Sequence, residues 1–448
     1  MELVFVLLLL VLFSLLMLGW PRTGAAMALA LTMLWPSYIV IQVSLGLWIN
    51  PQRLILPICL LIWLIHVLYV PAYRSRLRQV FDRHRTILNL IAAGLLIAVI
   101  SGFLSPFNKS QAVWGALNQI LFLGLPMLLV ITYFRHSRSV KKLIGLMVAV
   151  ALVSQLVGLV EFSQQQVVFS SLVAPGTEHA EQVLEGKTRY DQHRVTSVFD
   201  NPLSYAQFLV FMFPVLLFFT RFAETILGRV VVGAQLLAIP ISVWTTASRT
   251  GLALVLLCVF AGVGAWVLRA RIERYLQATL LLMIAGVLFA STTFLLLMTD
   301  SLTFFDGTQS IAASTTARLF QLVVGIPAIA VSPVYGVGIH QATNFMQGLT
   351  SIDNYYLTVV LEKGLLGLLI LVVLQWKVLV SLFQGAKSSR AADLRYFSAC
   401  LFVSFSALYL FQITLSVIEV FTVSNVLLAG FLSWTCSENR AKEERIDA

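Results

Sequence analysis

The sequence predicts an all-α polytopic membrane protein with about twelve or thirteen membrane-spanning helices. Hydrophobic residues make up 59% of the 448 residues and charged residues only 11%, and the mean hydropathy is +0.90. This balance differs strongly from that of a soluble domain. Apolar segments of roughly 20 residues, the length that crosses a bilayer, recur along the chain, and basic residues gather in the short breaks between them.

The apolar segments give one expected helix each. The first has no basic lead and no small-residue cleavage site, so we interpret it as a retained helix rather than a signal peptide. In the second, Pro36 and the apolar run 38–48 could instead form a broken or re-entrant piece. In chain order the expected spans are 2–20, 24–48, 54–72, 87–104, 112–134, 143–163, 202–220, 230–247, 251–268, 276–298, 353–376, 396–414 and 418–435.

The placement of the basic residues predicts the topology. The net charge of +10 would suit a nucleic-acid partner, but the basic residues lie in loops between spans, where the positive-inside rule makes them cytoplasmic. We therefore expect the lipid bilayer, and no nucleic acid, as the partner. The four basic clusters are Arg74, Arg76, Arg78, Arg83 and Arg85; Arg135, Arg138, Lys141 and Lys142; Arg269, Arg271 and Arg274; and Lys377, Lys387, Arg390 and Arg395.

This topology places two long loops, residues 163–201 and 300–352, on the face opposite the cytoplasm. We expect any chemistry on that face. The second loop is expected to contain a short interfacial helix. Residues 436–448 carry mixed charge without an apolar pattern and are expected to form a disordered cytoplasmic tail.

The sequence offers no pattern typical of a metal or cofactor site. Cys59, Cys258 and Cys400 fall within spans and Cys436 at a span edge, so the long loops have neither a disulfide framework nor a thiolate zinc site. The acidic residues Asp300, Asp306 and Asp353 share the outer face, but their spacing matches no defined metal site. We also find no phosphate-binding or dinucleotide-binding fingerprint, so we expect metal-independent chemistry without a cofactor.

Arg249 is the only charged residue between Arg229 and Arg269. That segment is too long for one span, because a helix rises about 1.5 Å per residue. Two helices must therefore meet near Arg249 at the outer membrane surface. The arginine either snorkels at a tight turn or contacts an anion at the helix junction.

The first long loop ends in a helix start and two unexplained residues. Asn201 followed by Pro202 is typical of a helix beginning, with an amide cap and proline at the first position. His193 and Arg194 have no such structural explanation, although either could be merely solvated.

The second long loop contains Arg318 followed by an apolar run, residues 319–331, of the length expected for a helix lying at the membrane interface. Gly336 and Gly338 suit a turn or a close backbone approach. His340 is a candidate general base, although a lone loop histidine is more often a hydrogen-bonding surface residue.

The next helix opens with Asp353, which could be its N-cap, or a functional carboxylate. Asn354, Thr358 and Glu362 follow at a spacing of four, which places them on one helix face. A polar stripe in a membrane helix should face the bundle interior. The three outer-face arginines, Arg194, Arg249 and Arg318, suit phosphate oxygens.

Together these segments resemble the O-antigen ligase and O-antigen polymerase superfamily of bacterial envelope glycosyltransferases. The resemblance lies in four motifs that follow in the family's order and cover residues 194 to about 374. They are RVTSVFDNPLSYA (194–206), TTASRTGLAL (245–254), TTARLFQLVVGIPAIAVSPVYGVG (315–338) and DNYYLTVVLEKGLLGLL (353–369).

The resemblance implies a multi-pass protein of the bacterial inner membrane that transfers a glycan from undecaprenyl diphosphate at the periplasmic face. Both donor and acceptor would be lipid-linked glycans, and a flippase and a chain-length regulator of the same pathway would be partners. Arg194, Arg249 and Arg318 match family arginines that hold the diphosphate. Family ligases usually carry a histidine where this chain has Asp353, so Asp353 favours the polymerases of O-antigen and exopolysaccharide pathways and is the expected catalytic base, with His340 as an alternative and Asn354 and Glu362 in support.

We therefore expect a polysaccharide polymerase. A ligase that transfers glycan to lipid A core or another surface acceptor is the alternative, and a transporter of lipid-linked sugars the second, although transporters of that class usually show internal repeats. The expected regions are 1–193 with N-terminal helices and the first long periplasmic loop, 194–376 with the catalytic core and the loop 300–352, 377–435 with C-terminal helices, and 436–448 with the tail.

Overall fold

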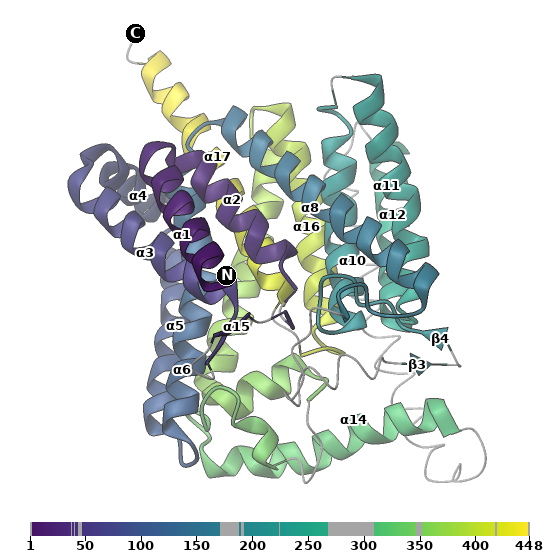
Figure 1. The fold of residues 1–448 in the computed structure, drawn as a ribbon. Helices are drawn as coiled ribbons and strands as arrows, with labels where there is room; N and C mark the ends of the chain where they lie inside the picture. The colour runs from purple at the N-terminus through teal and green to yellow at the C-terminus, as the bar shows by residue number, and fades with distance from the viewer. Residues whose placement is uncertain are drawn as a thin grey trace.

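The protein is a bundle of helices that run roughly side by side, with α14 (Gln309–Ala328) crossing one end (Figure 1). In the part of the chain that the computed structural model describes, nine helices are long and apolar enough to cross a membrane. The prediction of a largely helical, multi-pass membrane protein is confirmed at this level. The described residues are 2–36, 38–39, 41–43, 47–170, 188–189, 192–223, 225–267, 309–345, 352–416 and 419–446.

Most expected spans have a helical counterpart within a few residues, and the expected span 276–298 lies outside the described residues. The π-helical turn η1 joins α6 and α7 into one continuous apolar helical segment, Lys109–Tyr133. The other helices are α1 (Glu2–Gly19), α2 (Pro21–Leu34), α3 (Pro51–Tyr69), α4 (Pro71–Arg83), α5 (Arg85–Leu104), α6 (Lys109–Gln119), η1 (Ile120–Gly124), α7 (Leu125–Tyr133), α8 (Ser137–Gln164), α10 (Pro202–Phe219), α11 (Ile226–Thr245), α12 (Arg249–Val267), η3 (Ile329–Val331), η4 (Ala342–Phe345), α15 (Tyr355–Ser388), α16 (Ala392–Phe411) and α17 (Glu419–Ile446).

The expected single span 24–48 is wrong. Helix α2 ends at Leu34, two residues before Pro36, whose ring disfavours helical backbone in the residue that precedes it. The chain then forms an antiparallel hairpin of β1 (Ile41–Val43) and β2 (Leu47–Ile49). The alternative interpretation of this segment as a broken piece is the one that the structure supports.

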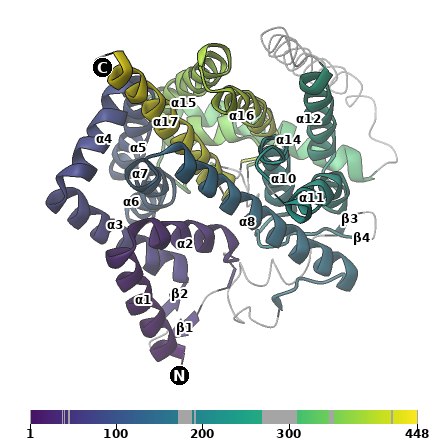
Figure 2. The same ribbon diagram turned by 90° about the horizontal axis from the view of Figure 1, so that it is seen from above.

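Helix α10 is the centre of the bundle because it is hydrophobic on every face. In the 18-residue apolar stretch of α10, 83% of the residues are buried, whereas in that of α11 only 28% are, so α11 lies at the periphery. Large buried side chains along α10, including Tyr205, Phe208 and Phe211, fill the space between its neighbours. Seen from above, α8, α11, α12 and α16 surround it (Figure 2).

Three of the four basic clusters meet at one end of the bundle, which we call the basic end. Arg76 Nη2 donates to the carbonyls of Arg135, at 3.3 Å, and Ser433, at 2.8 Å. Lys141 Nζ lies 2.6 Å from the Asp393 carboxylate. The cluster at residues 269–274 is outside the described part of the chain. The three clusters therefore share one end of the bundle, and the assignment of that end to the cytoplasm stays a prediction.

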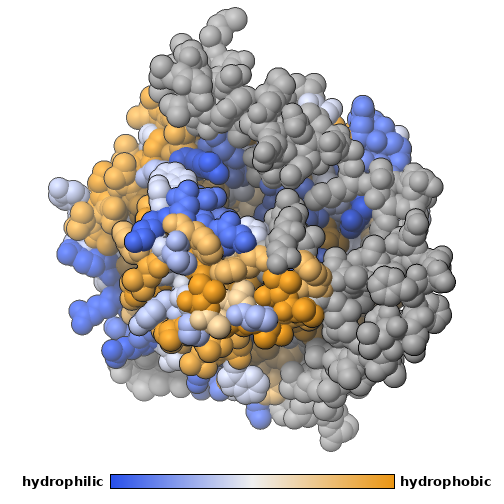
Figure 3. All heavy atoms as spheres, turned by 90° about the horizontal axis from the view of Figure 1, so that it is seen from below, coloured by the Kyte–Doolittle hydropathy of each residue, from blue (hydrophilic) through white to orange (hydrophobic). Residues whose placement is uncertain are grey.

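The opposite end, which we call the loop end, carries α14 and the short hairpin of β3 (Thr188–Arg189) and β4 (Gln192–His193) (Figure 1). Helix α14 is longer than expected, because it begins at Gln309 and has Arg318 in its middle rather than at its start. It packs on α15, where Ala328, Leu357 and Val360 share a small core. Seen from below, hydrophilic residues gather beside a broad hydrophobic surface (Figure 3).

The expectation of a disordered C-terminal tail is wrong for residues 436–446, which are helical. Helix α17 continues from its membrane-spanning part to Ile446, so most of residues 436–448 extend the helix at the basic end. Because acidic and basic residues alternate in this segment, helical i,i+4 pairing is compatible with its sequence, and the lack of an apolar face did not prevent a helix.

Candidate functional site

Arg194 and Arg249 lie at one junction of the loop end. The backbone N–H of Val195 donates to the Thr245 carbonyl at 3.2 Å. The Nε–H of Arg194 donates to the Thr246 carbonyl at 2.9 Å. Both acceptors are at the end of α11, and α12 begins at Arg249 three residues later. The end of the first long loop is therefore fastened to the turn that carries Arg249.

The turn between α11 and α12 follows from its sequence. Ala247 takes a left-handed backbone with φ of 51°, and the Ser248 hydroxyl accepts the Gly251 N–H at 3.1 Å. This bond satisfies one of the donors that every helix leaves open at its start. The prediction that two helices meet near Arg249 is confirmed, and the Arg249 side chain is exposed.

Glu161, near the end of α8, organises the segment that holds Arg194. Its carboxylate is completely buried and accepts hydrogen bonds from four donors. Thr196 supplies its N–H at 2.9 Å and its hydroxyl at 3.1 Å, and Ser197 supplies its N–H at 2.6 Å. His193 Nε2 lies 2.8 Å from the same carboxylate. Because these donors lie on both sides of Arg194 in sequence, Glu161 holds the His193 ring before that arginine and the backbone of Thr196 and Ser197 after it.

This arrangement explains His193, for which the sequence suggested no structural role. Its contact with Glu161 is structural and buried. Sequence reasoning did not single out Glu161, although an acidic residue inside an apolar span is a usable signal. Ser197 has φ of 59°, and the Tyr38 hydroxyl donates to its carbonyl at 3.3 Å. Burial, and then the charges of Glu161 and Asp200, raise the pKa of Tyr38, which stays a donor.

Arg318 and Asp353 form a second pair at the loop end. Arg318 Nε lies 3.4 Å from Asp353 Oδ2, and the two side chains are 36% and 33% exposed. Gln321, one turn after Arg318 on α14, accepts the Asp353 N–H at 2.9 Å through its side-chain oxygen. Helix α14 therefore positions both the guanidinium and the backbone of the carboxylate residue. A partly exposed ion pair adds about 1 kcal/mol of stability at most.

The polar stripe on α15 faces protein, as expected. The N-cap is Asn354 and not Asp353, because the Asn354 side chain accepts the Leu357 N–H at 3.0 Å. The Thr358 hydroxyl lies 2.7 Å from that of Ser416. Glu362 is buried and accepts the His340 N–H at 2.8 Å. The Asp353 carboxylate does not cap the helix and lies beside Arg318 instead.

Helix α15 is kinked directly after Glu362. Gly364 has φ of 70° and ψ of −176°, which breaks the helical hydrogen bonding. The loop after η3 replaces those bonds: Val337 N–H donates to the Leu361 carbonyl at 2.8 Å and Gly338 N–H to that of Glu362 at 3.0 Å. Leu365 N–H in turn donates to the Pro333 carbonyl at 2.8 Å. The open helix turn is thus paired with a loop, as irregular backbone within a membrane protein requires.

The glycines of YGVG permit this approach. A Cβ on Gly336 would lie 2.3 Å from the Glu362 carbonyl carbon, and one on Gly338 would lie 2.7 Å from the Ala112 side chain. Both glycines also have positive φ. The prediction of a close backbone approach at these two residues is confirmed.

His340 lies away from Asp353. It packs near Gly115 of α6, and its backbone bond goes to Glu362, which follows Asp353 by nine residues, or about 13 Å of helix rise. Desolvation, and then the charge of Arg53, lower the pKa of His340, although part of the side chain stays exposed. The structure therefore groups His340 and Glu362 with the kink, and Asp353 with Arg318.

The described residues contain no group of three or more histidine, cysteine, aspartate or glutamate side chains that could hold a metal ion. Asp300 and Asp306 lie outside the described residues. The candidate site is instead cationic. Arg194, Arg249 and Arg318 come from the first loop, the α11–α12 turn and α14, which all lie at the loop end (Figure 1).

A comparison with protein-family models finds no match to this chain, and a comparison with curated protein sequences finds none either.

Proposed function

We propose that this protein is a membrane glycosyltransferase that polymerises undecaprenyl-diphosphate-linked oligosaccharide units into O-antigen or exopolysaccharide, at the periplasmic face of a bacterial inner membrane. The observation that carries the proposal is the Arg318–Asp353 pair at the loop end, the same end as the junction of Arg194 and Arg249. A carboxylate beside an arginine combines a candidate base with a group that binds anions.

In the proposed reaction, an acceptor sugar hydroxyl attacks the anomeric carbon of the donor glycan. The bond between that carbon and the diphosphate oxygen breaks, and the electron pair leaves with undecaprenyl diphosphate. Asp353 takes the hydroxyl proton, and the arginines stabilise the negative charge that develops on the leaving group. No metal ion or cofactor enters this scheme.

The pairing of Arg318 with Asp353 suggests how the donor would prepare the base. Asp353 engages Nε of the guanidinium, whose terminal nitrogens carry further donors that match two phosphate oxygens. A diphosphate that binds Arg318 competes with Asp353 for the same charge. Donor binding would thus release the carboxylate for the acceptor hydroxyl, which couples the two substrates.

The first test is a gel of surface and lipid-linked glycans from a source strain that lacks the gene. Single repeat units in place of long chains support a polymerase. Full-length chains that accumulate on undecaprenyl diphosphate, with a bare final acceptor, would show a ligase. Repeat units retained on the cytoplasmic side would show a transporter. Unchanged glycans would contradict all three.

Complementation with point variants tests the site itself. Asp353→Asn removes the base and Arg318→Gln removes the cation, and each should stop chain elongation while leaving the protein folded, because the pair is partly exposed. The matched controls are Asp82→Asn and Arg78→Gln, which neutralise an exposed i,i+4 pair on α4. Wild-type chain length with Asp353→Asn would remove this residue from the mechanism.

A further inference from the structure

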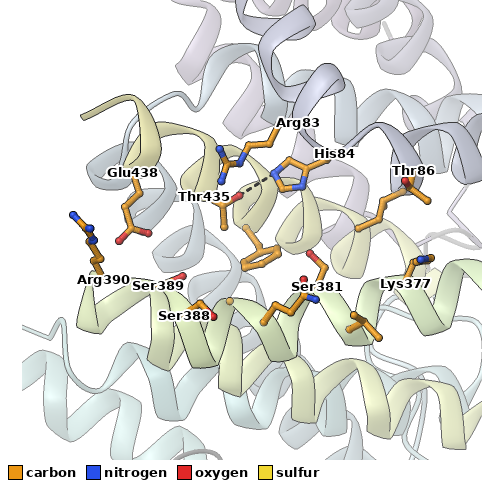
Figure 4. A pocket seen from close by; sticks show the side chains of 15 residues that line it. Arg83, His84, Thr86, Lys377, Ser381, Ser388, Ser389, Arg390, Thr435 and Glu438 are labelled. Atoms are coloured by element: carbon orange, nitrogen blue, oxygen red, sulfur yellow. Dashed lines mark hydrogen bonds between the residues drawn. The ribbon is translucent and has the colours of Figure 1, made fainter. Parts of the chain in front are cut away.

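A cavity of about 740 Å³ lies at the basic end between α5, α15 and α17 (Figure 4). Nothing in the proposed transfer reaction uses it. Its position follows from the antiparallel packing of α5 against α15. Ser101 contacts the Glu362 carbonyl near one end of the pair, and Gly94 meets Ile370 in the middle. The cavity is reached about two turns further along, at Ile87 of α5.

The cavity is at the other membrane boundary from the candidate site. Lys377, its innermost residue on α15, follows Asp353 by 24 residues of sequence, or about 36 Å of helix rise. The hydrocarbon core of a bilayer is about 30 Å thick. A ligand at this cavity therefore cannot take part directly in chemistry at Arg318 and Asp353.

The cavity lining carries more positive than negative charge. Arg83, Lys377 and Arg390 come from three separate places in the chain and border one space, and Glu438 is the carboxylate of the lining (Figure 4). One Glu438 oxygen already accepts the Ala391 N–H at 2.6 Å. A topology signal requires basic residues near the membrane surface, but it does not require them around one concave space.

The neutral groups of the lining suit a phosphate. Ser381, Ser388 and Ser389 place hydroxyl donors between the cations (Figure 4). The N terminus of α5 also opens here, and no side chain caps it. His84 supplies no charge at pH 7, because burial, followed by Arg83, lowers its pKa to about 4; its ring is bonded to Thr435 at 3.0 Å.

Apolar side chains of three helices also border the cavity. Ile87 lies one turn deeper on α5 than His84, and Phe431 one turn deeper on α17 than Thr435. Val380 borders the cavity from α15, one turn nearer the basic end than Lys377. A lining that combines cations with apolar side chains matches the boundary between a lipid headgroup and its acyl chains.

We propose that this cavity binds a phosphate-bearing anion at the cytoplasmic membrane boundary, held by Arg83, Lys377 and Arg390. The shared chemistry is the phosphate group, which either an anionic phospholipid or a free phosphate in solution supplies. The depth of Lys377 and the apolar side chains that border the same space favour the phospholipid. The site is independent of the transferase reaction, and so is its test.

The test uses the full-length protein in nanodiscs of phosphatidylcholine, with and without phosphatidylglycerol, and separately with millimolar inorganic phosphate. Native mass spectrometry measures retained lipid, and a thermal melt measures stabilisation. The wild type should retain phosphatidylglycerol over phosphatidylcholine and melt about 2–4 °C higher in its presence. Lys377→Gln and the combined R83Q, K377Q and R390Q variant should lose both the lipid retention and the rise in melting temperature. In the combined variant the apparent affinity for phosphatidylglycerol should fall by at least about tenfold.

The matched control is Arg74→Gln, on the same helix as Arg83 and exposed, but outside the cavity lining. A response to phosphatidylglycerol that disappears only in the cavity variants supports a lipid site. A response to inorganic phosphate with the same loss supports a soluble phosphate. The proposal is overturned if neither probe has an effect, if the cavity variants respond as the wild type does, or if Arg74→Gln loses the response equally.

Discussion

Glu161 is the residue whose replacement should affect both the fold and the candidate site. We expect Glu161→Ala to remove the acceptor of two buried backbone N–H groups, those of Thr196 and Ser197, and of the His193 ring. Each buried donor left unpaired costs about 1–3 kcal/mol. The two backbone groups alone therefore predict a loss of about 2–6 kcal/mol in the free energy of unfolding.

The same change should lower glycan chain length in the complementation assay more than stability alone explains. Arg194 lies between two of the residues that Glu161 holds, so its guanidinium would no longer be fixed beside the α11–α12 turn. Glu161→Gln keeps the volume but places an amide N–H against donors. We expect it to fall between Glu161→Ala and the wild type.

The assay is a thermal melt of the detergent-purified variants together with the glycan gel. The control is Gln164→Ala, one turn further along α8 with an exposed side chain, which should change the free energy of unfolding by less than about 0.5 kcal/mol. If Glu161→Ala melts at the same temperature as this control, the four hydrogen bonds do not stabilise the loop end and the reasoning fails.

Three further predictions concern the rest of the molecule. Gly364→Ala should lower the melting temperature strongly, because φ is 70° and the new Cβ would lie 2.1 Å from the Val334 carbonyl oxygen. The control Gly233→Ala, whose new Cβ would meet nothing within 4 Å, should be neutral or slightly stabilising. Equal melting temperatures for the two variants would contradict the kink at Gly364. Because the pKa of His84 falls from 6.5 to about 4 on folding, the unfolded chain binds a proton that the folded chain does not, so stability should fall as the pH drops from about 6.5 to 4, by up to roughly 3 kcal/mol. Melts of His84→Asn across that pH range should lack this component, and a slope identical to that of the wild type would exclude His84 as its source. Glycan transfer by the purified protein should be unaffected by a chelator, and activity restored only by a divalent ion would overturn the metal-independent scheme.

Local and compositional features were predictable from the sequence. Apolar length predicts most of the helices that are long enough to cross a bilayer, because backbone groups in hydrocarbon must pair within the helix, but it did not predict the hairpin at residues 41–49. The helix start at Asn201 and Pro202 was also predictable, and the structure shows the Asn201 side chain accepting the Leu203 N–H at 3.0 Å. The meeting of two helices near Arg249 followed from the length of the apolar segment around it. Each of these inferences uses residues within one or two helix turns, or a simple length.

Only the tertiary structure decided which polar groups meet. Arg194 reaches Thr246 across 52 residues, and Arg318 reaches Asp353 across 35. Neither pairing is visible in local periodicity. The sequence also left open whether Asp353 caps the helix, because Asp353 and Asn354 are equally good caps in isolation. The sequence thus determined that this chain is a membrane bundle with basic clusters between its apolar segments, because hydropathy and charge act on each segment separately. The structure decided that Asp353 faces Arg318 and that Glu161 holds the segment around Arg194, because a buried or partly buried polar group takes its partner from whichever element folding brings beside it.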